Sequence, residues 1–417
     1  MFVMEETLRS FNRLLSIAGV TIYSETKFNS KPWIFLQICN FIAGIFALIF
    51  TTGYVVVNLT DVATLLRGAS IWSTCIIMSI TLGICLFYRQ RFREYVYEMA
   101  YVDSIVKLPL IKLVLTTNKS GKKIGELKQL VLNSQEKLYY YTRVFLSLYV
   151  FFVFLTATLY LVNPMYRIIT NKNPDKRIFA YDMWFPWSND NIYVYTFTFI
   201  YHIYAGYLCC IAYPGFQGTI LLLLGQVIRQ LRILTFIMLN LKELTQDLVG
   251  TDRKIWQKHC TCVLSQCVQH YIYLKSFSGR LNTICKPFYL ALIMDATVLV
   301  CMCSVQIAIS SFSMEMFKFY IHEICFILMV LTFCVLGQQL DNEAELLENA
   351  VLEKWYIYDT THKKHVHIFK MALSQGMTVK IFGSINLSLL TFSWFLKTEM
   401  SFFTLIMSLF EDIKQDN

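Results

Sequence analysis

The chain has 417 residues, of which 56% are hydrophobic and 16% charged, with a mean hydropathy of +0.49. Soluble domains carry about 25% charged residues, so this chain has too few polar side chains to cover a soluble protein of its length. Intrinsic disorder is excluded too, because disordered chains are rich in charge and poor in aromatic residues, whereas 16% of this chain is aromatic. The composition predicts an all-α protein that crosses a lipid bilayer several times.

The formal net charge is +9, but the basic residues stand beside apolar segments. This placement indicates membrane orientation and not nucleic-acid binding. The 13 cysteines show no metal-ligand spacing, and we expect small buried side chains. His362, His365 and His367 neighbour two lysines, and a solvated basic loop is favoured over a metal site there. No phosphate loop, zinc-protease motif or nucleophile elbow is present, so neither an enzyme nor a cofactor is predicted.

Seven apolar stretches are long enough to cross a bilayer at about 20 residues each. The fourth stretch is too long for one crossing, so its helix is expected to project beyond the membrane. The seven stretches are residues 34–57, 69–88, 144–163, 191–228, 287–314, 319–340 and 381–410.

The connecting segments predict the orientation. In one alternating set they hold 28 Lys and Arg residues, against six in the other set. Short basic segments stay in the cytoplasm, so the N-terminus is expected inside and the C-terminus outside. No signal peptide is evident, and the first span is expected to insert as a signal anchor. Asn58-Leu-Thr60 is a glycosylation sequon that falls outside in this topology.

The long cytoplasmic segments show helical periodicity, for example at Leu231, Leu234 and Leu241, and are expected to extend the membrane helices. Their apolar stripes fit either packing within one chain or an assembly domain between subunits. The expected organisation is a cytoplasmic segment at 1–33, helices 1–4 with a ligand pocket at 34–224, assembly segments at 225–286 and 341–380, helices 5–6 at 287–340, and a pore helix with an extracellular tail at 381–417.

The last apolar stretch has two distinct faces. Thr398, Ser401, Leu405 and Leu409 follow at intervals of three to four and share one face. A face that changes from small polar residues to leucine fits a water-filled cavity that narrows to a hydrophobic gate. The alternative is a helix that faces lipid or protein.

The same helix carries charged residues. Lys397 and Glu399 are two residues apart and cannot pair directly, so both are expected in a vestibule on the cytoplasmic side. Glu411 and Asp412 follow the constriction. They fit either an outer mouth that concentrates cations or a solvated tail.

Two segments resemble the insect odorant receptors. One runs Cys-Val-Gln-His-Tyr-Ile-Tyr-Leu-Lys-Ser-Phe-Ser-Gly-Arg-Leu-Asn-Thr-Ile from Cys267. The other starts at Gly337-Gln-Gln-Leu, passes Trp355-Tyr356 and Ser374-Gln375, and ends in Leu-Ser-Leu-Leu-Thr-Phe-Ser-Trp-Phe-Leu-Lys-Thr-Glu-Met-Ser-Phe-Phe-Thr-Leu from Leu387. The second matches that family's C-terminal signature in order and spacing.

The resemblance implies an odorant-gated, non-selective cation channel that passes monovalent and divalent cations. It implies a tetramer with odorant co-receptor subunits in the plasma membrane of sensory neurons. The loop between the fourth and fifth spans has about 60 residues, shorter than in the co-receptor, so the chain resembles a tuning subunit. By the same match, Leu405 and Leu409 stand at the gate positions.

The resemblance also places the pocket for a small volatile odorant in the outer half of the membrane. An apolar pocket with a few polar groups is expected there. A gustatory-type channel of the same superfamily and a secondary transporter remain as alternatives, the latter because Pro214-Gly215 fits a broken helix. The candidate odorant-binding residues are Trp72, Cys75, Met78, Ser79, Phe152, Thr156, Tyr160, Tyr195, Phe199, His202, Phe319, Tyr320 and Glu323.

Overall fold

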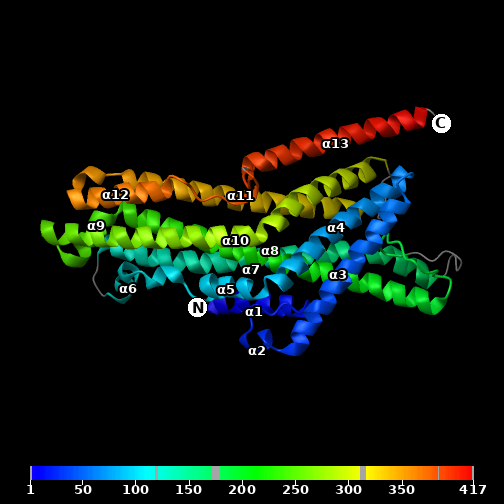
Figure 1. The fold of residues 1–417 in the computed structure, drawn as a ribbon, viewed down its shortest axis with the longest axis horizontal. Helices are drawn as coiled ribbons and strands as arrows, with labels where there is room; N and C mark the ends of the chain where they lie inside the picture. The colour runs from blue at the N-terminus through cyan, green and yellow to red at the C-terminus, as the bar shows by residue number, and fades with distance from the viewer. Residues whose placement is uncertain (1, 118–120, 171–178, 310–315, 384, 416–417) are drawn as a thin grey trace.

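Seven long helices make up most of the computed structural model (Figure 1), which describes residues 2–117, 121–170, 179–309, 316–383 and 385–415. Each holds one predicted span. Within the described residues, six are long and apolar enough to cross a membrane, while the seventh carries Lys397 and Glu399. The seven are α3 (Lys31–Val57), α4 (Val62–Phe87), α7 (Lys122–Thr170), α8 (Ile192–Leu239), α10 (Arg253–Ile309), α11 (Phe317–Leu352) and α13 (Leu389–Gln415).

Shorter elements occupy the segments between the long helices. The last helix begins at Leu389, later than the predicted residue 381, because the preceding residues form a small antiparallel pair in which Lys380 lies opposite Asn386. The shorter elements are α1 (Phe2–Ile17), α2 (Glu25–Phe28), α5 (Arg89–Val96), the π-helix η1 (Tyr97–Tyr101), the 3₁₀ helices η2 (Ser104–Lys107) and η3 (Trp355–Ile357), α6 (Pro109–Thr116), α9 (Leu241–Val249), α12 (Thr360–Leu373), β1 (Lys380–Phe382) and β2 (Ile385–Asn386).

The helix α8 forms the centre of the bundle. The Asn191 side chain caps its first turn by accepting a hydrogen bond from the Tyr193 amide at 2.9 Å. The helix continues through Pro214 to Leu239, so the break that a transporter would need at Pro214-Gly215 is absent from this described helix. Tertiary packing on all sides of α8 compensates for the hydrogen bond that proline removes.

Aromatic rings join α8 to its neighbours. Phe216 of α8 stacks on Phe92 of α5 with ring centroids 5.5 Å apart, and meets Phe288 of α10 edge-on at 5.1 Å. Phe288 in turn contacts Phe333 of α11 at 5.6 Å. All four side chains are buried. Edge-on aromatic pairs of this kind add to the free energy of burial, and they fix α5, α8, α10 and α11 relative to one another.

The segment 225–286 folds as predicted into helical extensions, held by a buried polar network. Arg229 of α8 forms an ion pair with Asp103 at 2.6 Å, with side chains 4% and 11% exposed. The next residue, Gln230, lies 2.8 Å from the His270 ring nitrogen of α10. Both buried charges of this network, Arg229 and Asp103, therefore have a partner.

The histidine cluster differs from the solvated loop that the sequence predicted. Residues 360–373 form α12. His362 is buried against Tyr358, with ring centroids 4.0 Å apart, whereas His367 is exposed. Burial lowers the pKa of His362 to about 4, so this imidazole is neutral at physiological pH and packs as an aromatic ring. The apolar face of α12 packs inward and buries His362 with it, whereas His367 lies outside that face. The three histidines therefore do not form one solvated cluster.

The helix α11 approaches the segment before α13 most closely at Gly337. A Cβ atom placed on Gly337 would lie 2.1 Å from the Leu387 carbonyl oxygen and 2.8 Å from the Leu387 Cβ. Only glycine allows this approach. The contact positions the start of α13, two residues after Leu387.

Substitution of Gly337 by alanine should therefore destabilise the protein despite the higher helix propensity of alanine. The clash is with backbone, which must move. We expect a drop in the melting temperature of the purified protein, measured by intrinsic fluorescence. Gly279→Ala in α10 is the matched control, because nothing lies within 4 Å of its added Cβ. This control should be neutral or stabilise by roughly 0.5–1 kcal/mol. Equal melting temperatures for the two variants would contradict the close contact.

Candidate functional site

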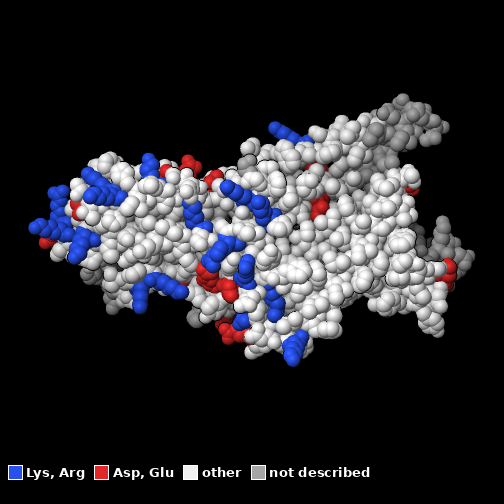
Figure 2. All heavy atoms as spheres, in the orientation of Figure 1, with Lys and Arg blue, Asp and Glu red and all other residues white. Residues whose placement is uncertain are grey.

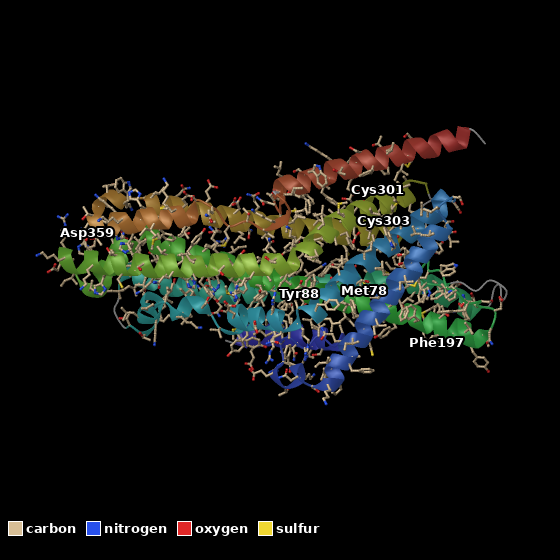
Figure 3. All side chains as sticks on the ribbon, viewed as in Figure 1. Met78, Tyr88, Phe197, Cys301, Cys303 and Asp359 are labelled. Atoms are coloured by element: carbon tan, nitrogen blue, oxygen red, sulfur yellow. The ribbon has the colours of Figure 1, made fainter. Side chains whose placement is uncertain are left out.

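A small cavity of about 80 Å³ lies among α4, α7, α8 and α11. Figure 3 shows Met78, one of its wall residues, inside the bundle. The wall is mainly aliphatic, aromatic and sulfur-containing, so a ligand there would be held chiefly by dispersion and by exclusion from water. It comprises Ile71, Thr74, Cys75, Met78, Tyr149, Val153, Thr156, Ala157, Tyr160, Tyr181, Met183, Ala205, Gly206, Cys209, Cys210, Tyr213, His322, Cys325 and Phe326.

A polar cluster joins four helices in the wall. The two ring nitrogens of His322 in α11 each lie 3.4 Å from a hydroxyl oxygen, Nε2 from Thr74 in α4 and Nδ1 from Tyr160 in α7. The Tyr213 hydroxyl donates to the Thr74 carbonyl. A histidine is expensive to bury without partners, and these hydroxyls satisfy it. The cluster gives an otherwise apolar cavity one site of directional hydrogen bonding.

Tyr181, from the segment between α7 and α8, closes another part of the wall. Its hydroxyl lies against Gly206, where a Cβ would come within 2.2 Å of the oxygen. Its backbone amide donates to His202 at 3.3 Å. The Tyr181 hydroxyl is buried and has no hydrogen-bond partner among the described groups. An unsatisfied buried hydroxyl costs free energy, and a polar ligand atom in the cavity could recover it.

Four candidate odorant-binding residues line this cavity, namely Cys75, Met78, Thr156 and Tyr160. The other nine lie outside it. Trp72 donates to Thr52 at 2.9 Å, Ser79 donates to the Gly44 carbonyl at 3.2 Å, and Ser304 donates to Glu323 at 2.8 Å. The remaining six are Phe152, Tyr195, Phe199, His202, Phe319 and Tyr320.

The side of the helix on which a candidate residue lies decides whether it lines the cavity. Phe152 is exposed although Thr156 on the next turn is buried. His202 and Tyr195 pack against Phe179 in the segment before α8, with ring centroids 4.9 and 5.2 Å apart. They therefore support the segment that carries Tyr181 without facing the cavity.

Sequence reasoning missed most of the wall, including His322, Tyr213 and Phe326 as cavity residues. On α7 the wall residues are 149, 153, 156, 157 and 160, and on α8 they are 205, 206, 209, 210 and 213. This spacing is one helical face. Extending the face from Thr156 and Tyr160 would have found the α7 residues. Tyr181 and Met183 come from an irregular segment and carry no periodic signal.

The last helix α13 leaves the bundle toward its C-terminal end (Figure 1). Leu405 is 54% exposed and Ser401 is exposed, while Thr398 is half-buried. The side chains of Leu409, Glu411 and Asp412 lie outside the described residues, although their backbone is helical. The predicted polar-to-leucine face is thus largely uncovered within a single chain.

Glu399 corrects the expected vestibule. Its side chain is 5% exposed and neither carboxylate oxygen has a hydrogen-bond partner among the described groups, whereas Lys397 is exposed. Residues two apart on a helix point in nearly opposite directions, so only Lys397 can face a vestibule here. Glu399 turns toward α10 and α11, which α13 contacts, and interacts electrostatically with Glu323.

Asn58 caps the C-terminal end of α3. Its side-chain amide nitrogen donates to the Tyr54 carbonyl at 2.8 Å. The side chain is half-buried at the turn before α4. A glycan attached to this nitrogen would lie beside the C-terminal end of α3.

Comparisons with known proteins agree with the arrangement of the helices. A family model described as 7tm Odorant receptor matches residues 61–400. Odorant receptor 13a of Drosophila melanogaster is 26% identical over 272 residues, which cover 61% of this chain and 63% of that receptor. The chain thus aligns with less than two thirds of the length of this curated relative.

Solved structures share the fold over nearly the full length. The insect olfactory receptor OR5 from Machilis hrabei matches with a TM-score of 0.76 at 10% identity, covering 97% of this chain and 98% of that one, both alone and in complex with eugenol. The prediction of an all-α membrane protein with seven spans is confirmed. Because the family model covers most of the sequence, including the greater part of the C-terminal signature, the chain belongs to the 7tm odorant receptor family.

Proposed function

We propose that the protein binds a small volatile odorant in the cavity among α4, α7, α8 and α11, and that binding opens a non-selective cation pore. The pore would form in a tetramer with odorant co-receptor subunits, in the plasma membrane of sensory neurons. The supporting observation is a small, mainly apolar cavity in a member of an odorant receptor family, with one hydrogen-bonding cluster and one hydroxyl, that of Tyr181, without a hydrogen-bond partner among the described groups.

The cavity restricts the ligand. Its volume of about 80 Å³ is below the ~300 Å³ at which drug-sized sites begin. A ligand must therefore be small or must displace flexible side chains, and Met78 and Met183 in the wall are suited to such movement. The aromatic wall and the hydroxyls favour a compact apolar molecule with one polar group. Eugenol in the related OR5 structure is of this chemical class.

The helix α11 offers a route from the cavity to the pore. His322, Cys325 and Phe326 line the cavity, and Gly337 lies further along the same helix against Leu387. A ligand that shifts α11 would move the start of α13. Such a shift opens a pore only if the ligand binds the open arrangement more tightly.

The proposed pore lies along α13. Four copies of the face with Thr398, Ser401, Leu405 and Leu409 would surround a water-filled path that narrows at the leucines. Exposure of Leu405 in the single chain leaves that face available for partner subunits. Glu411 and Asp412 would attract monovalent and divalent cations at the outer mouth, and the helical extensions at 225–286 and 341–380 would hold the subunits together.

The distribution of charge supports an N-terminus in the cytoplasm. On the face in Figure 2, Lys and Arg gather over the half of the molecule that holds α9 and α12, and over a central band, while the other half is nearly uncharged. Basic residues favour the cytoplasmic side. Asn58 then lies outside, where its sequon could carry a glycan.

Tyr181→Phe tests the cavity. We expect the half-effective concentration of an odorant alcohol or ether to rise about fivefold, because roughly 1 kcal/mol of hydrogen bonding is lost. The response to a hydrocarbon of the same length should not change. Currents are recorded from cells that express each variant with the co-receptor.

Tyr320→Phe is the matched control, since this tyrosine lies outside the cavity and is 37% exposed. It should leave both responses unchanged. An equal loss for the alcohol and the hydrocarbon in Tyr181→Phe would mean that the hydroxyl has only a structural role.

Leu405→Ala tests the pore face. A smaller side chain at the constriction makes dewetting less favourable, so current without ligand should increase severalfold at equal surface expression. Met400→Ala, also exposed but on the opposite face of α13, should retain the basal current of the original protein. Identical currents in all three proteins would reject α13 as the gate.

A further inference from the structure

A second, larger cavity of about 670 Å³ opens between α7, α8 and α11. It lies where the apolar stretches of α7 and α11 end, at Val144 and Leu340, and where α8 passes into its helical extension. Its volume is within the ~300–1,000 Å³ range of ligand sites. It is lined by Glu126, Gln129, Leu130, Asn133, Ser134, Lys137, Leu138, Tyr141, Leu221, Gly225, Ile228, Arg229, Arg232, Phe236, Leu336 and Gln339.

The charges around this cavity leave cationic groups available. The Nε of Arg232 forms an ion pair with Glu343 at 2.6 Å, so its two terminal nitrogens remain for a ligand. The Lys137 ammonium is exposed and has no ion pair or hydrogen bond with the described residues. The carboxylate of Glu126 in the wall is paired with Lys123 at 2.9 Å, and thus does not neutralise Lys137.

Further charged residues lie around this cavity. Arg229 is held at the floor by Asp103. Glu136 lines a neighbouring cavity of about 310 Å³ on the other side of Lys137, where Tyr140 also lies. The lining itself carries three basic residues and one acidic residue, while the paired and neighbouring carboxylates bring the wider surroundings close to neutral. This balance suits a singly charged anion better than a polyanion.

Polarity changes along the length of the cavity. Tyr141, Leu221 and Leu336 lie at the membrane end, where the apolar spans begin. Neutral amides and a hydroxyl, from Gln129, Asn133, Ser134 and Gln339, lie toward the helical extensions. Tyr140 and Tyr141 are both exposed, as is typical of tyrosines at a membrane–water boundary.

We propose that this cavity binds an anionic phospholipid with a hydroxylated headgroup, of the phosphatidylinositol class. Lys137 and Arg232 hold the phosphate, the amides bind the hydroxyl groups, and the acyl chains run along Leu221 and Leu336 into the bilayer. The apolar end favours a lipid over a soluble phosphate, which would leave those side chains uncovered. The inference does not depend on odorant binding or on a pore.

The test is a titration of the purified full-length protein in a neutral detergent. The probes are dioctanoyl phosphatidylinositol, dioctanoyl phosphatidylcholine and inositol 1-phosphate, with binding read by native mass spectrometry and by the melting temperature. Phosphatidylinositol is expected to bind one molecule per chain and to raise the melting temperature. The other two probes should bind at least tenfold more weakly.

Lys137→Gln should weaken phosphatidylinositol binding about fivefold, the effect expected of one basic residue at an anionic lipid. Lys128→Gln is the matched control, because position 128 lies on the opposite face of α7, nine residues away, and does not line the cavity. The double variant Arg232→Gln, Glu343→Gln removes the second cation without leaving a buried carboxylate unpaired. It should weaken binding by a similar factor.

Three outcomes would overturn the proposal. Equal binding of phosphatidylcholine would remove the role of the charge and the headgroup hydroxyls. Equal binding of inositol 1-phosphate would indicate a soluble anion in place of a lipid. Unchanged binding in both the Lys137 variant and the double variant, at unchanged melting temperature of the lipid-free protein, would place the lipid elsewhere. None of these outcomes bears on the odorant cavity.

Discussion

The contact between Gly337 and Leu387 fixes how α11, the helix that contributes to both cavities, meets the segment before α13. It joins α11 to the segment before α13 at a distance that no side chain could permit. Three residues along α11 make these contacts. His322 lines the cavity, Gly337 forms the close contact, and Glu343 pairs with Arg232. Because interiors are closely packed, a displacement of α11 at one of these positions would have to be accommodated at the other two.

Buried polar groups mark where this bundle departs from simple apolar packing. The nitrogens of His322 are met by Thr74 and Tyr160, and Arg229 is met by Asp103. Glu399 and the Tyr181 hydroxyl, by contrast, lack hydrogen-bond partners among the described residues. Since unsatisfied buried groups cost free energy, these are two of several places where a ligand or a partner could supply a missing hydrogen bond.

The spans followed from the sequence because hydropathy is a local property of each segment. Within the described residues each of the seven stretches holds a long helix, although the last begins only at Leu389, and the segment 225–286 is helical, in line with its apolar periodicity. The cavity was only partly predictable. Cys75, Met78, Thr156 and Tyr160 were identified, but Tyr181 comes from an irregular segment whose position depends on packing against Gly206 and His202. Glu399 was misplaced because the sequence shows that Lys397 and Glu399 diverge, but not which one faces the bundle.

The difference in burial between α8 and α13 indicates which helix lacks packing partners in the single chain. On α8, nearly every residue from Leu208 to Leu234 is buried, including polar ones such as Gln217 and Gln230. On α13, large apolar side chains such as Met400, Phe402 and Leu405 are exposed on several faces. The serines and threonines between them (Thr398, Ser401 and Thr404) donate their hydroxyls to carbonyls of their own helix, so these groups are satisfied against lipid, protein or water alike. Exposure of large apolar groups on several faces of α13 therefore means that lipid or partner subunits must cover much of this helix, as they would around the proposed pore.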